Sequence, residues 1–227
     1  MIKAVVFDLD HTLFDRYGTI NEIAPEICKA FDLNDGITVE VFTRELCYAD
    51  KQFVHKGWQF IHKYLVEKNV FKMVPTYDFY ATTVFEKFKT KTVKYSFAIP
   101  VLKELKSMGL KTGLITNGES ALQRFKIKNL DLDGLFDEVI ISGETPYAKP
   151  QKEIFHLMSQ RLGIEPSEMV YAGDHPLNDV YGSRNAGCVP IWVKTTGTWV
   201  FPEIEEPELQ VETVEEIPQL VSILNRG

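Results

Sequence analysis

The sequence predicts an α/β protein: a parallel β-sheet with helices on both faces, carrying an inserted domain made only of helices. Short apolar segments bounded by glycine or polar residues recur along the chain and alternate with helical patterns. Such alternation, with nearly continuous apolar strands, is typical of a parallel sheet that is covered on both faces. One long segment shows helical periodicity without a strand, which predicts the second domain.

Five apolar segments are predicted strands of the sheet. They are IKAVVFD (2–8), KTGLITN (111–117), FDEVIIS (136–142), EMVYAGD (168–174) and VPIWVK (189–194). Helical patterns lie between them at 99–108, 119–130, 151–162 and 178–187. Pro150 opens the third of these patterns and Gly187 closes the fourth, as expected at helix ends. The acidic, proline-rich tail predicts a loop followed by a short closing helix.

Residues 17–92 interrupt this rhythm. Their apolar residues repeat at helical spacing in about four groups, of which Ile23, Ile27 and Phe31 form the first. We therefore predict a helical domain at 17–92 and a sheet domain made of 1–16 and 93–227. The insertion follows the C-terminal end of the first strand, which is the edge where open α/β sheets bind ligands.

Composition narrows the class of partner. The 227 residues are 44% hydrophobic and 25% charged, with a formal net charge of -7. This charge argues against nucleic acid or an anionic membrane as the main partner, but a bound cation would still allow a small anionic substrate. The apolar opening is too short for a signal peptide, and no segment approaches the roughly 18 apolar residues of a membrane-spanning helix.

The three cysteines have no metal-binding or disulfide spacing. Cys28, Cys47 and Cys188 are scattered along the chain without a CxxC motif. This pattern argues against a disulfide framework or a structural zinc site, and it favours a reducing compartment. We expect a cytoplasmic monomer or homodimer.

Two carboxylates end the first predicted strand. Side chains two residues apart on a strand point the same way, so Asp8 and Asp10 project together. Two ionised carboxylates at that distance repel each other unless a cation or a shared proton intervenes. Taken alone, the pair is also compatible with one solvated carboxylate, or with one that caps the next turn.

Three further polar clusters are expected at the same edge of the sheet. They are Thr116, Asn117 and Gly118 after the second strand, Lys149 before a helix, and Asp174 followed by Asp179 after the fourth strand. Because the C-terminal ends of parallel strands meet at one edge, we expect the clusters to converge there.

These four segments, in this order, resemble the motifs of the haloacid dehalogenase-like hydrolase superfamily. The matching segments are VVFDLDHTL, LITNG, AKP and GDHPLND, between residues 5 and 179. Each motif is weak alone, whereas the ordered set is specific. The resemblance implies a Rossmann-like core, with residues 17–92 as the helical cap domain that the family inserts after its first motif.

The resemblance also implies a reaction. Asp8 would be the nucleophile that attacks phosphorus and forms an aspartyl-phosphate, and Asp10 would be the general acid and then the general base. Mg²⁺ would be held by Asp8, Asp174 and the backbone carbonyl of Asp10, since this ion favours oxygen ligands.

Other residues would support these groups. Thr116 and Lys149 would hold the phosphoryl oxygens, with Asn117 and the Gly118 N–H as helpers at a helix N-terminus. Thr12 would orient Asp10 by a hydrogen bond. Asp179 is equally compatible with a metal ligand and with a capping or supporting residue. His11 and His175 are expected to support the site or face solvent, rather than to act in catalysis.

Residues 50–63 of the helical domain are the candidate specificity segment. Lys51, His55, Lys56 and Trp58 surround a glycine that could form a turn above a substrate. A solvated helix face with a core tryptophan explains the same pattern. The aromatic residues of 77–88 are expected in the core of this domain.

The favoured function is therefore a Mg²⁺-dependent phosphatase acting on a small phosphorylated metabolite, such as a nucleotide, a sugar phosphate or phosphoglycolate. A phosphomutase would share the nucleophile but would not release inorganic phosphate. A metal-free dehalogenase would displace halide, although Asp10 and the acidic fourth motif argue against it. A non-enzymatic binding protein is the alternative from another class.

Overall fold

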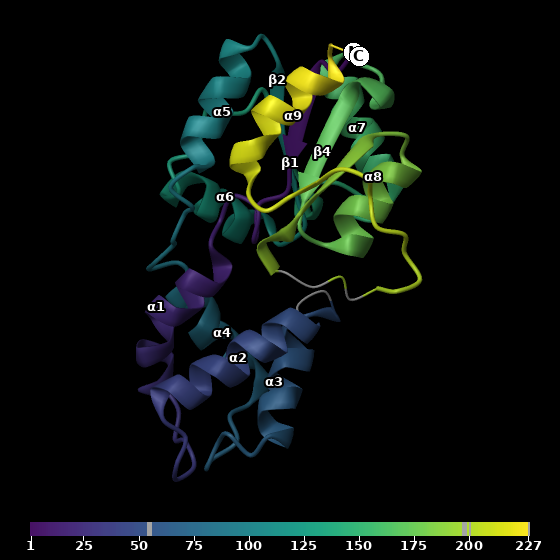
Figure 1. Cartoon of the computed structure of the whole chain (residues 1–227). Helices are drawn as coiled ribbons and strands as arrows, with labels where there is room; N and C mark the ends of the chain where they lie inside the picture. Colours follow the sequence, from purple (N-terminus) through teal and green to yellow (C-terminus); the bar gives the residue numbers. More distant parts are fainter. Residues whose placement is uncertain (54–55, 197–198, 200, 227) are drawn as a thin grey trace. The chain divides into compact units, whose positions relative to one another are not determined.

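The structure is a computed structural model that describes residues 1–53, 56–196, 199 and 201–226. It divides into two compact units (Figure 1). The sheet unit consists of Met1–Asp15 and Lys94–Gly227, and the helical unit is Arg16–Val93.

The sheet unit contains a six-stranded sheet in which every neighbouring pair is parallel. The strands are β1 (Ala4–Phe7), β2 (Lys111–Thr116), β3 (Glu138–Ile141), β4 (Met169–Gly173), β5 (Val189–Val193) and β6 (Gln210–Val211), in the spatial order β3-β2-β1-β4-β5-β6. Each of the five predicted strands is confirmed. The two-residue β6 was not predicted, because it lies in the acidic tail and is too short to show a period.

Helices cover both faces of this sheet (Figure 1). They are α5 (Ala98–Ser107), α6 (Ser120–Asn129), α7 (Lys152–Leu162), α8 (Gly182–Asn185) and α9 (Ile217–Leu224). Helix α5 packs against α9, whereas α7 packs against α8. Val6, Ile115 and Tyr171 of the strands form a fully buried core with Phe155 and Met158 of α7. The prediction of a parallel sheet with two covered faces is therefore confirmed.

One predicted helix differs in the structure. The pattern at 178–187 is a π-helical segment, Pro176–Tyr181, followed by the single turn of α8. The ring Nδ1 of His175 accepts hydrogen bonds from the backbone N–H groups of Leu177 and Asn178, both at 3.2 Å. This cap starts the helix earlier than the apolar pattern does. Short π-helical segments are frequently found at functional sites.

The helical unit contains four α-helices in its described residues. They are α1 (Arg16–Cys28), α2 (Val39–Phe53), α3 (Trp58–Glu67) and α4 (Tyr77–Phe88). Helix α1 packs against α2 and α4, and α3 packs against the same two helices. No described helix of either unit has the length and apolar character needed to cross a membrane.

The strand order places a switch point at β1. The chain continues from β1 to β2 and β3 on one side of the sheet, and then from β4 to β6 on the other. Open α/β sheets bind ligands at the C-terminal ends of the strands where the order reverses. Asp8 follows β1, Thr116 ends β2 and Asp174 follows β4. The three strands around the switch point therefore all end in a predicted site residue.

Candidate active site

The ammonium group of Lys149 lies at the centre of the site. Only 6% of this residue is exposed, and its Nζ donates to Asp8 Oδ1 at 2.5 Å, Asp179 Oδ1 at 2.6 Å and the Tyr171 hydroxyl at 2.9 Å. Burial disfavours the charge on the lysine, but the two carboxylates outweigh burial and raise the pKa of Lys149. All three protons of the ammonium have an acceptor, so a buried positive charge is fixed beside Asp8.

Asn117 holds the backbone of Lys149. Its Nδ2 donates to the Lys149 carbonyl and its Oδ1 accepts from the Lys149 N–H, both at 2.9 Å. We expected the Asn117 amide to contact a phosphate oxygen. In the structure both ends of the amide are engaged by Lys149 instead, because the loop before α7 runs alongside the end of β2. Asn117 thus positions Lys149 from a different strand.

Three carboxylates gather beside Lys149. One oxygen each from Asp8, Asp174 and Asp179 lies within 4.8 Å of the others, and all three residues are buried. Burial raises the pKa of Asp8 to about 7, and Asp179 and Asp10 add to the rise, while Lys149 opposes it. Burial, followed by Asp179 and Asp8, also raises the pKa of Asp174 well above its usual value. A nearby positive charge would therefore stabilise the ionised carboxylates of this cluster.

This donor set fits a divalent cation. Asp8, Asp174 and Asp179 supply three carboxylates, and the lysine that contacts this cluster among the described residues is Lys149. If all the carboxylates ionise, two negative charges remain uncompensated. An oxygen-rich site with such an excess suits Mg²⁺.

Asp179 already uses both of its oxygens. Oδ1 accepts from Lys149 and from the Tyr171 hydroxyl, and Oδ2 accepts from the His175 N–H at 2.9 Å. Of the two roles left open by the sequence, these contacts favour support of Lys149 over direct metal ligation. A Cβ at Gly173 would overlap the Asp179 carboxylate, so glycine is needed there.

The two histidines of the motifs, His11 and His175, lie in a tight turn and at the start of a helical segment. His175 caps the π-helical segment through Nδ1 and lies 5.4 Å from the Phe201 ring, between centroids. His11 is 7% exposed and adopts a left-handed backbone with a φ of 64°. The tight turn after β1 imposes this conformation, which ordinary residues adopt at a cost.

Asp10 has two partners that the sequence did not reveal. Lys126 Nζ lies 2.7 Å from Asp10 Oδ1 and 2.9 Å from Oδ2. Gln123 Nε2 lies 3.3 Å from Asp10 Oδ2 and also donates to Thr116 Oγ1 and to the Asn117 carbonyl, both at 2.7 Å. A signal was present: in α6, Gln123 and Lys126 occur three residues apart on the same face as the buried Leu122 and Ile127.

The remaining predicted residues have mixed outcomes. Thr116 Oγ1 accepts from Gln123, so its own proton is still available for an anion. The Gly118 N–H donates to Ser142 Oγ at 2.9 Å instead of pointing at a free anion site. The expected Thr12 hydrogen bond is wrong, because its buried Oγ1 has no hydrogen-bond partner among the described residues.

The turn after β1 is held by its backbone. The N–H groups of Thr12, Leu13 and Phe14 all approach the Leu9 carbonyl, at 3.3, 3.0 and 2.9 Å. Such convergence on one carbonyl holds the turn without help from the threonine hydroxyl. The side chains seen to contact Asp10 come from α6.

In the helical unit, the candidate specificity segment lies at the border between the buried core and the exposed surface. His55 lies outside the described residues. Lys56 is exposed, with its Nζ 5.9 Å from the centroid of the Phe53 ring. Trp58 is half-buried and lies edge-on to Phe88, with 5.6 Å between ring centroids. These contacts favour a core tryptophan.

Comparison with known proteins identifies the family. The sequence model described as "Haloacid dehalogenase-like hydrolase" matches residues 5–193, which is most of the chain. The chain belongs to the haloacid dehalogenase-like hydrolases. The resemblance inferred from the four ordered motifs is thus confirmed.

Curated relatives of this hydrolase match between about half and nearly all of its length. A glyceraldehyde 3-phosphate phosphatase of Pyrococcus furiosus is 29% identical over 99% of this chain and 94% of its own. A glyceraldehyde 3-phosphate phosphatase of Methanopyrus kandleri is 32% identical over 86% of this chain and 84% of its own. A phosphoserine phosphatase of Thermus thermophilus is 36% identical, but over 54% of this chain and 49% of its own.

Solved structures share the fold. A putative HAD-hydrolase from Bacillus subtilis, determined bound to magnesium, has a TM-score of 0.77 and 18% identity, covering 97% of this chain and 98% of its own. An L-2-haloacid dehalogenase from Xanthobacter autotrophicus has a TM-score of 0.70 and 22% identity, covering 98% of this chain and 99% of its own. At these identities the likeness concerns the architecture alone.

Proposed function

We propose that this hydrolase is a Mg²⁺-dependent phosphatase that hydrolyses a small phosphomonoester through an aspartyl-phosphate on Asp8. The observation that carries the proposal is the buried ammonium of Lys149, fixed between Asp8 and Asp179 at the edge of the sheet. A fixed positive charge beside a carboxylate nucleophile is what phosphoryl transfer requires, since charge stabilisation and positioning supply most of its acceleration. The names of the relatives support the same reaction.

In the first step, an Asp8 oxygen attacks phosphorus while the ester P–O bond breaks. Lys149 holds Asp8 Oδ1, and the described residues offer Oδ2 no hydrogen bond, so Oδ2 is the oxygen left to attack. Asp10 gives its proton to the departing ester oxygen, which leaves as an alcohol. Asp8 then carries the phosphoryl group as a mixed anhydride.

In the second step, water attacks the phosphorus of the anhydride and Asp10 takes up the water proton. The bond between phosphorus and the Asp8 oxygen breaks, which releases inorganic phosphate and restores the carboxylate. Splitting the reaction this way replaces one difficult displacement with two easier ones.

Two groups would stabilise the phosphoryl oxygens. The Thr116 hydroxyl has its proton free to donate, and the Lys149 ammonium, whose three protons already have acceptors, would act by its charge. Asp8, Asp174 and the backbone carbonyl of Asp10 would hold Mg²⁺. When bound, the ion would neutralise the excess negative charge of this cluster and of the phosphate.

Substrate choice is assigned to the helical unit in this proposal, because the residues at the sheet edge address only the phosphoryl group. Glyceraldehyde 3-phosphate heads the candidates, since relatives named for that activity match most of the chain. We place the enzyme in the cytoplasm, since the three cysteines are free thiols.

The test measures inorganic phosphate released from a panel of phosphomonoesters, with Mg²⁺ and with a chelator. The panel holds glyceraldehyde 3-phosphate, phosphoserine, phosphoglycolate, a hexose phosphate and a nucleoside monophosphate. We expect release that depends on Mg²⁺ and is absent in Asp8→Asn. Substrate isomerisation without phosphate release would indicate a mutase, and halide release from 2-haloacids in chelator would indicate a dehalogenase.

A further inference from the structure

We propose that Lys126 and Gln123 are positioning residues that hold the Asp10 carboxylate in its working orientation for proton transfer. Both project from the buried face of α6, and neither belongs to the four motifs. The inference rests on the proposed function, because it assumes that Asp10 exchanges a proton with the leaving group and with water.

Lys126 contacts both oxygens of the carboxylate. Its Nζ lies 2.7 Å from Oδ1 and 2.9 Å from Oδ2 of Asp10. Contact with both oxygens opposes rotation of the carboxylate about its last torsion, which is otherwise broad. The Lys126 side chain is 2% exposed and that of Asp10 is 23% exposed. The lysine is thus withdrawn from solvent while the carboxylate keeps an accessible part.

Gln123 links Asp10 to the other groups of the site. One amide nitrogen approaches Asp10 Oδ2, Thr116 Oγ1 and the Asn117 carbonyl. Asn117 in turn holds the backbone of Lys149. The two N–H protons of this amide serve the two 2.7 Å contacts, so Gln123 is anchored to Thr116 and Asn117 and lies against Asp10 at the longer 3.3 Å.

The cost of these contacts argues against a purely structural role. Gln123 Oε1 is buried and has no hydrogen-bond partner among the described residues, which carries a desolvation cost. A buried ion pair is weak evidence for a structural role, since apolar residues can often replace both partners without loss. Lys126→Met removes only one partner, but the Asp10 side chain is 23% exposed and can be hydrated. Lys126 also lies 5.1 Å from the centroid of the Phe14 ring, so a methionine would find apolar packing there.

Lys126 is also poorly suited to bind the substrate itself. With 2% of its side chain exposed and its ammonium against Asp10, it presents almost no surface to a phosphate. Its two contacts with Asp10 make that carboxylate the group through which we expect Lys126 to act. Displacing a reacting group by about 1 Å can cost a hundredfold in rate, so an unfixed Asp10 would act poorly even though it is present.

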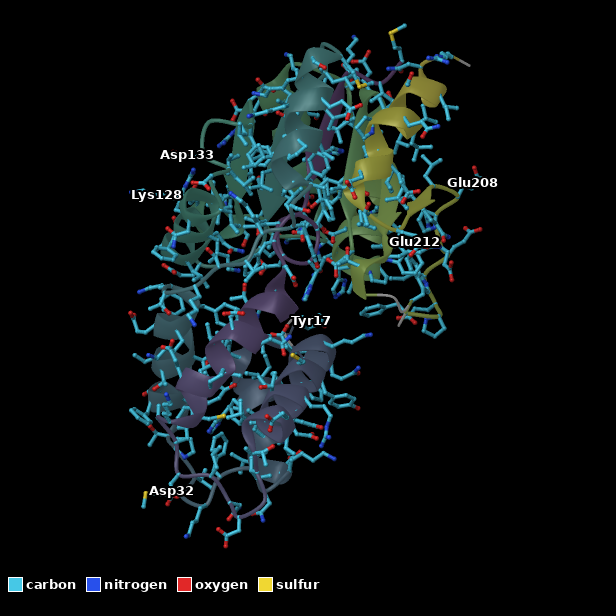
Figure 2. All side chains as sticks on the ribbon, turned by 60° about the vertical axis from the view of Figure 1, so that its left-hand side comes forward. Tyr17, Asp32, Lys128, Asp133, Glu208 and Glu212 are labelled. Atoms are coloured by element: carbon cyan, nitrogen blue, oxygen red, sulfur yellow. The ribbon has the colours of Figure 1, made fainter. Side chains whose placement is uncertain are left out.

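The experiment compares Lys126→Met with Lys128→Met on an alkyl phosphate and on p-nitrophenyl phosphate. Lys128 is exposed on the same helix and is labelled in Figure 2. An alkyl leaving group needs a proton, whereas p-nitrophenolate leaves without one. We expect kcat/KM of Lys126→Met to fall about 10- to 100-fold for the alkyl ester and only a few-fold for the aryl ester. Lys128→Met should match the wild type on both.

A double-variant cycle tests whether Lys126 acts through Asp10. Once Asp10→Asn has removed the proton donor, Lys126→Met should cause no further loss on the alkyl ester, because residues that act as a unit are not additive. Gln123→Met, which changes no charge, should shift the alkyl-to-aryl ratio in the same direction as Lys126→Met. Equal losses on both esters, or multiplicative losses in the double variant, would overturn the inference.

A crystallographic arm needs no turnover and separates this inference from the proposed function. In the structure of Lys126→Met, the Asp10 carboxylate should be rotated or spread over several positions, while Asp8 and Lys149 keep theirs. An Asp10 that stays in place would overturn the inference even if the wild type is an active phosphatase. A wild type that releases no phosphate from any ester would count against the proposed function, and this arm would still decide the positioning role.

Discussion

Each unit of the molecule buries an ion pair, and the two pairs differ in the groups that surround them. In the helical unit, Arg16 binds Asp50 through two hydrogen bonds, Nε to Oδ2 at 2.8 Å and Nη2 to Oδ1 at 2.7 Å. The guanidinium lies over the Trp58 and Phe88 rings, 5.6 and 5.0 Å from their centroids. The guanidinium and the Asp50 carboxylate meet in a bidentate geometry, within an aromatic setting that suits arginine.

At the edge of the sheet, one ammonium faces more acid than it can neutralise. Lys149 contacts Asp8 and Asp179, with Asp174 close by, and burial raises the pKa of Asp8 to about 7. A folded protein gains nothing from burying carboxylates that repel each other. Packing accounts for a bidentate pair in an aromatic setting, whereas three buried carboxylates beside one ammonium indicate a cation-binding site and chemistry.

The largest effect should come from Asp8→Asn, which removes one carboxylate of the acidic cluster and should reduce the rate of phosphate release. We expect more than about a thousandfold loss of phosphate release, because the variant lacks the nucleophile. Stability should not fall with activity, because an uncharged amide relieves the repulsion. A variant that retains substantial turnover in the phosphate assay would exclude Asp8 as the nucleophile.

In the absence of divalent ions, the same variant should also change how the stability of the protein depends on pH. A pKa raised to about 7 in the folded state means that folding favours protonated Asp8. Its contribution to stability is complete below about pH 4 and is lost as the pH rises through 7. Urea unfolding in chelator should show this decline in the wild type and a weaker one in Asp8→Asn. Parallel curves would contradict the pKa assigned to Asp8.

Arg16→Met should lower the free energy of unfolding and test the ion pair of the helical unit. It leaves the buried Asp50 without its guanidinium partner, which typically costs about 3–5 kcal/mol of unfolding free energy. Arg44→Met is the matched control in α2, because 70% of the Arg44 side chain is exposed and its pair with Glu45 contributes less than about 1 kcal/mol. Similar denaturant midpoints for the two variants would mean that the Arg16–Asp50 pair does not stabilise the helical unit.

Mg²⁺ should stabilise the sheet unit through the acidic cluster. At about 100 times its dissociation constant, a bound ion adds about 2.7 kcal/mol, which is a rise of several degrees in Tm. Asp174→Asn should abolish this rise. Asp133→Asn, which changes an exposed carboxylate labelled in Figure 2, should keep it. Equal Mg²⁺ shifts in both variants would place the ion elsewhere.

The smallest effect is expected at an exposed pair, which tests whether burial sets the scale. Arg124 and Ser120 bind Glu144 and lower its pKa to about 2. A lowered pKa means stability that is present above about pH 4.5 and is lost as the pH falls through 2. Because half of the Arg124 side chain is exposed, Glu144→Gln should cost less than about 1 kcal/mol at pH 7. A cost as large as that of Arg16→Met would show that burial does not govern these pairs.

The sequence predicted the sheet and the ends of its strands well, because buried parallel strands are apolar runs and their C-terminal ends are polar. Asp8, Lys149 and Asp174 could be expected at one edge because the C-terminal ends of parallel strands meet there, and they lie together in the structure. The two-residue β6 was missed because nothing periodic marks it.

The direction of side chains could not be predicted in the same way. Whether the Asn117 amide faces a ligand or the Lys149 backbone depends on how two loops meet, which no local pattern records. Gln123 and Lys126 reach Asp10 from a helix more than a hundred residues away in sequence. A motif identifies the residues that carry out the chemistry, whereas the residues that position them are identified only once the packing of the fold is known.

The most direct test of the central claim is to trap the phosphorylated enzyme. The wild type is mixed with substrate, quenched within one turnover and reduced with borohydride, which converts an aspartyl-phosphate to homoserine. Mass spectrometry of the peptide that spans residues 4–16 then locates the modified residue. We expect homoserine at position 8, and none when substrate is omitted. Homoserine at position 10, or its absence from an enzyme that releases phosphate, would contradict the assignment of Asp8 as the nucleophile.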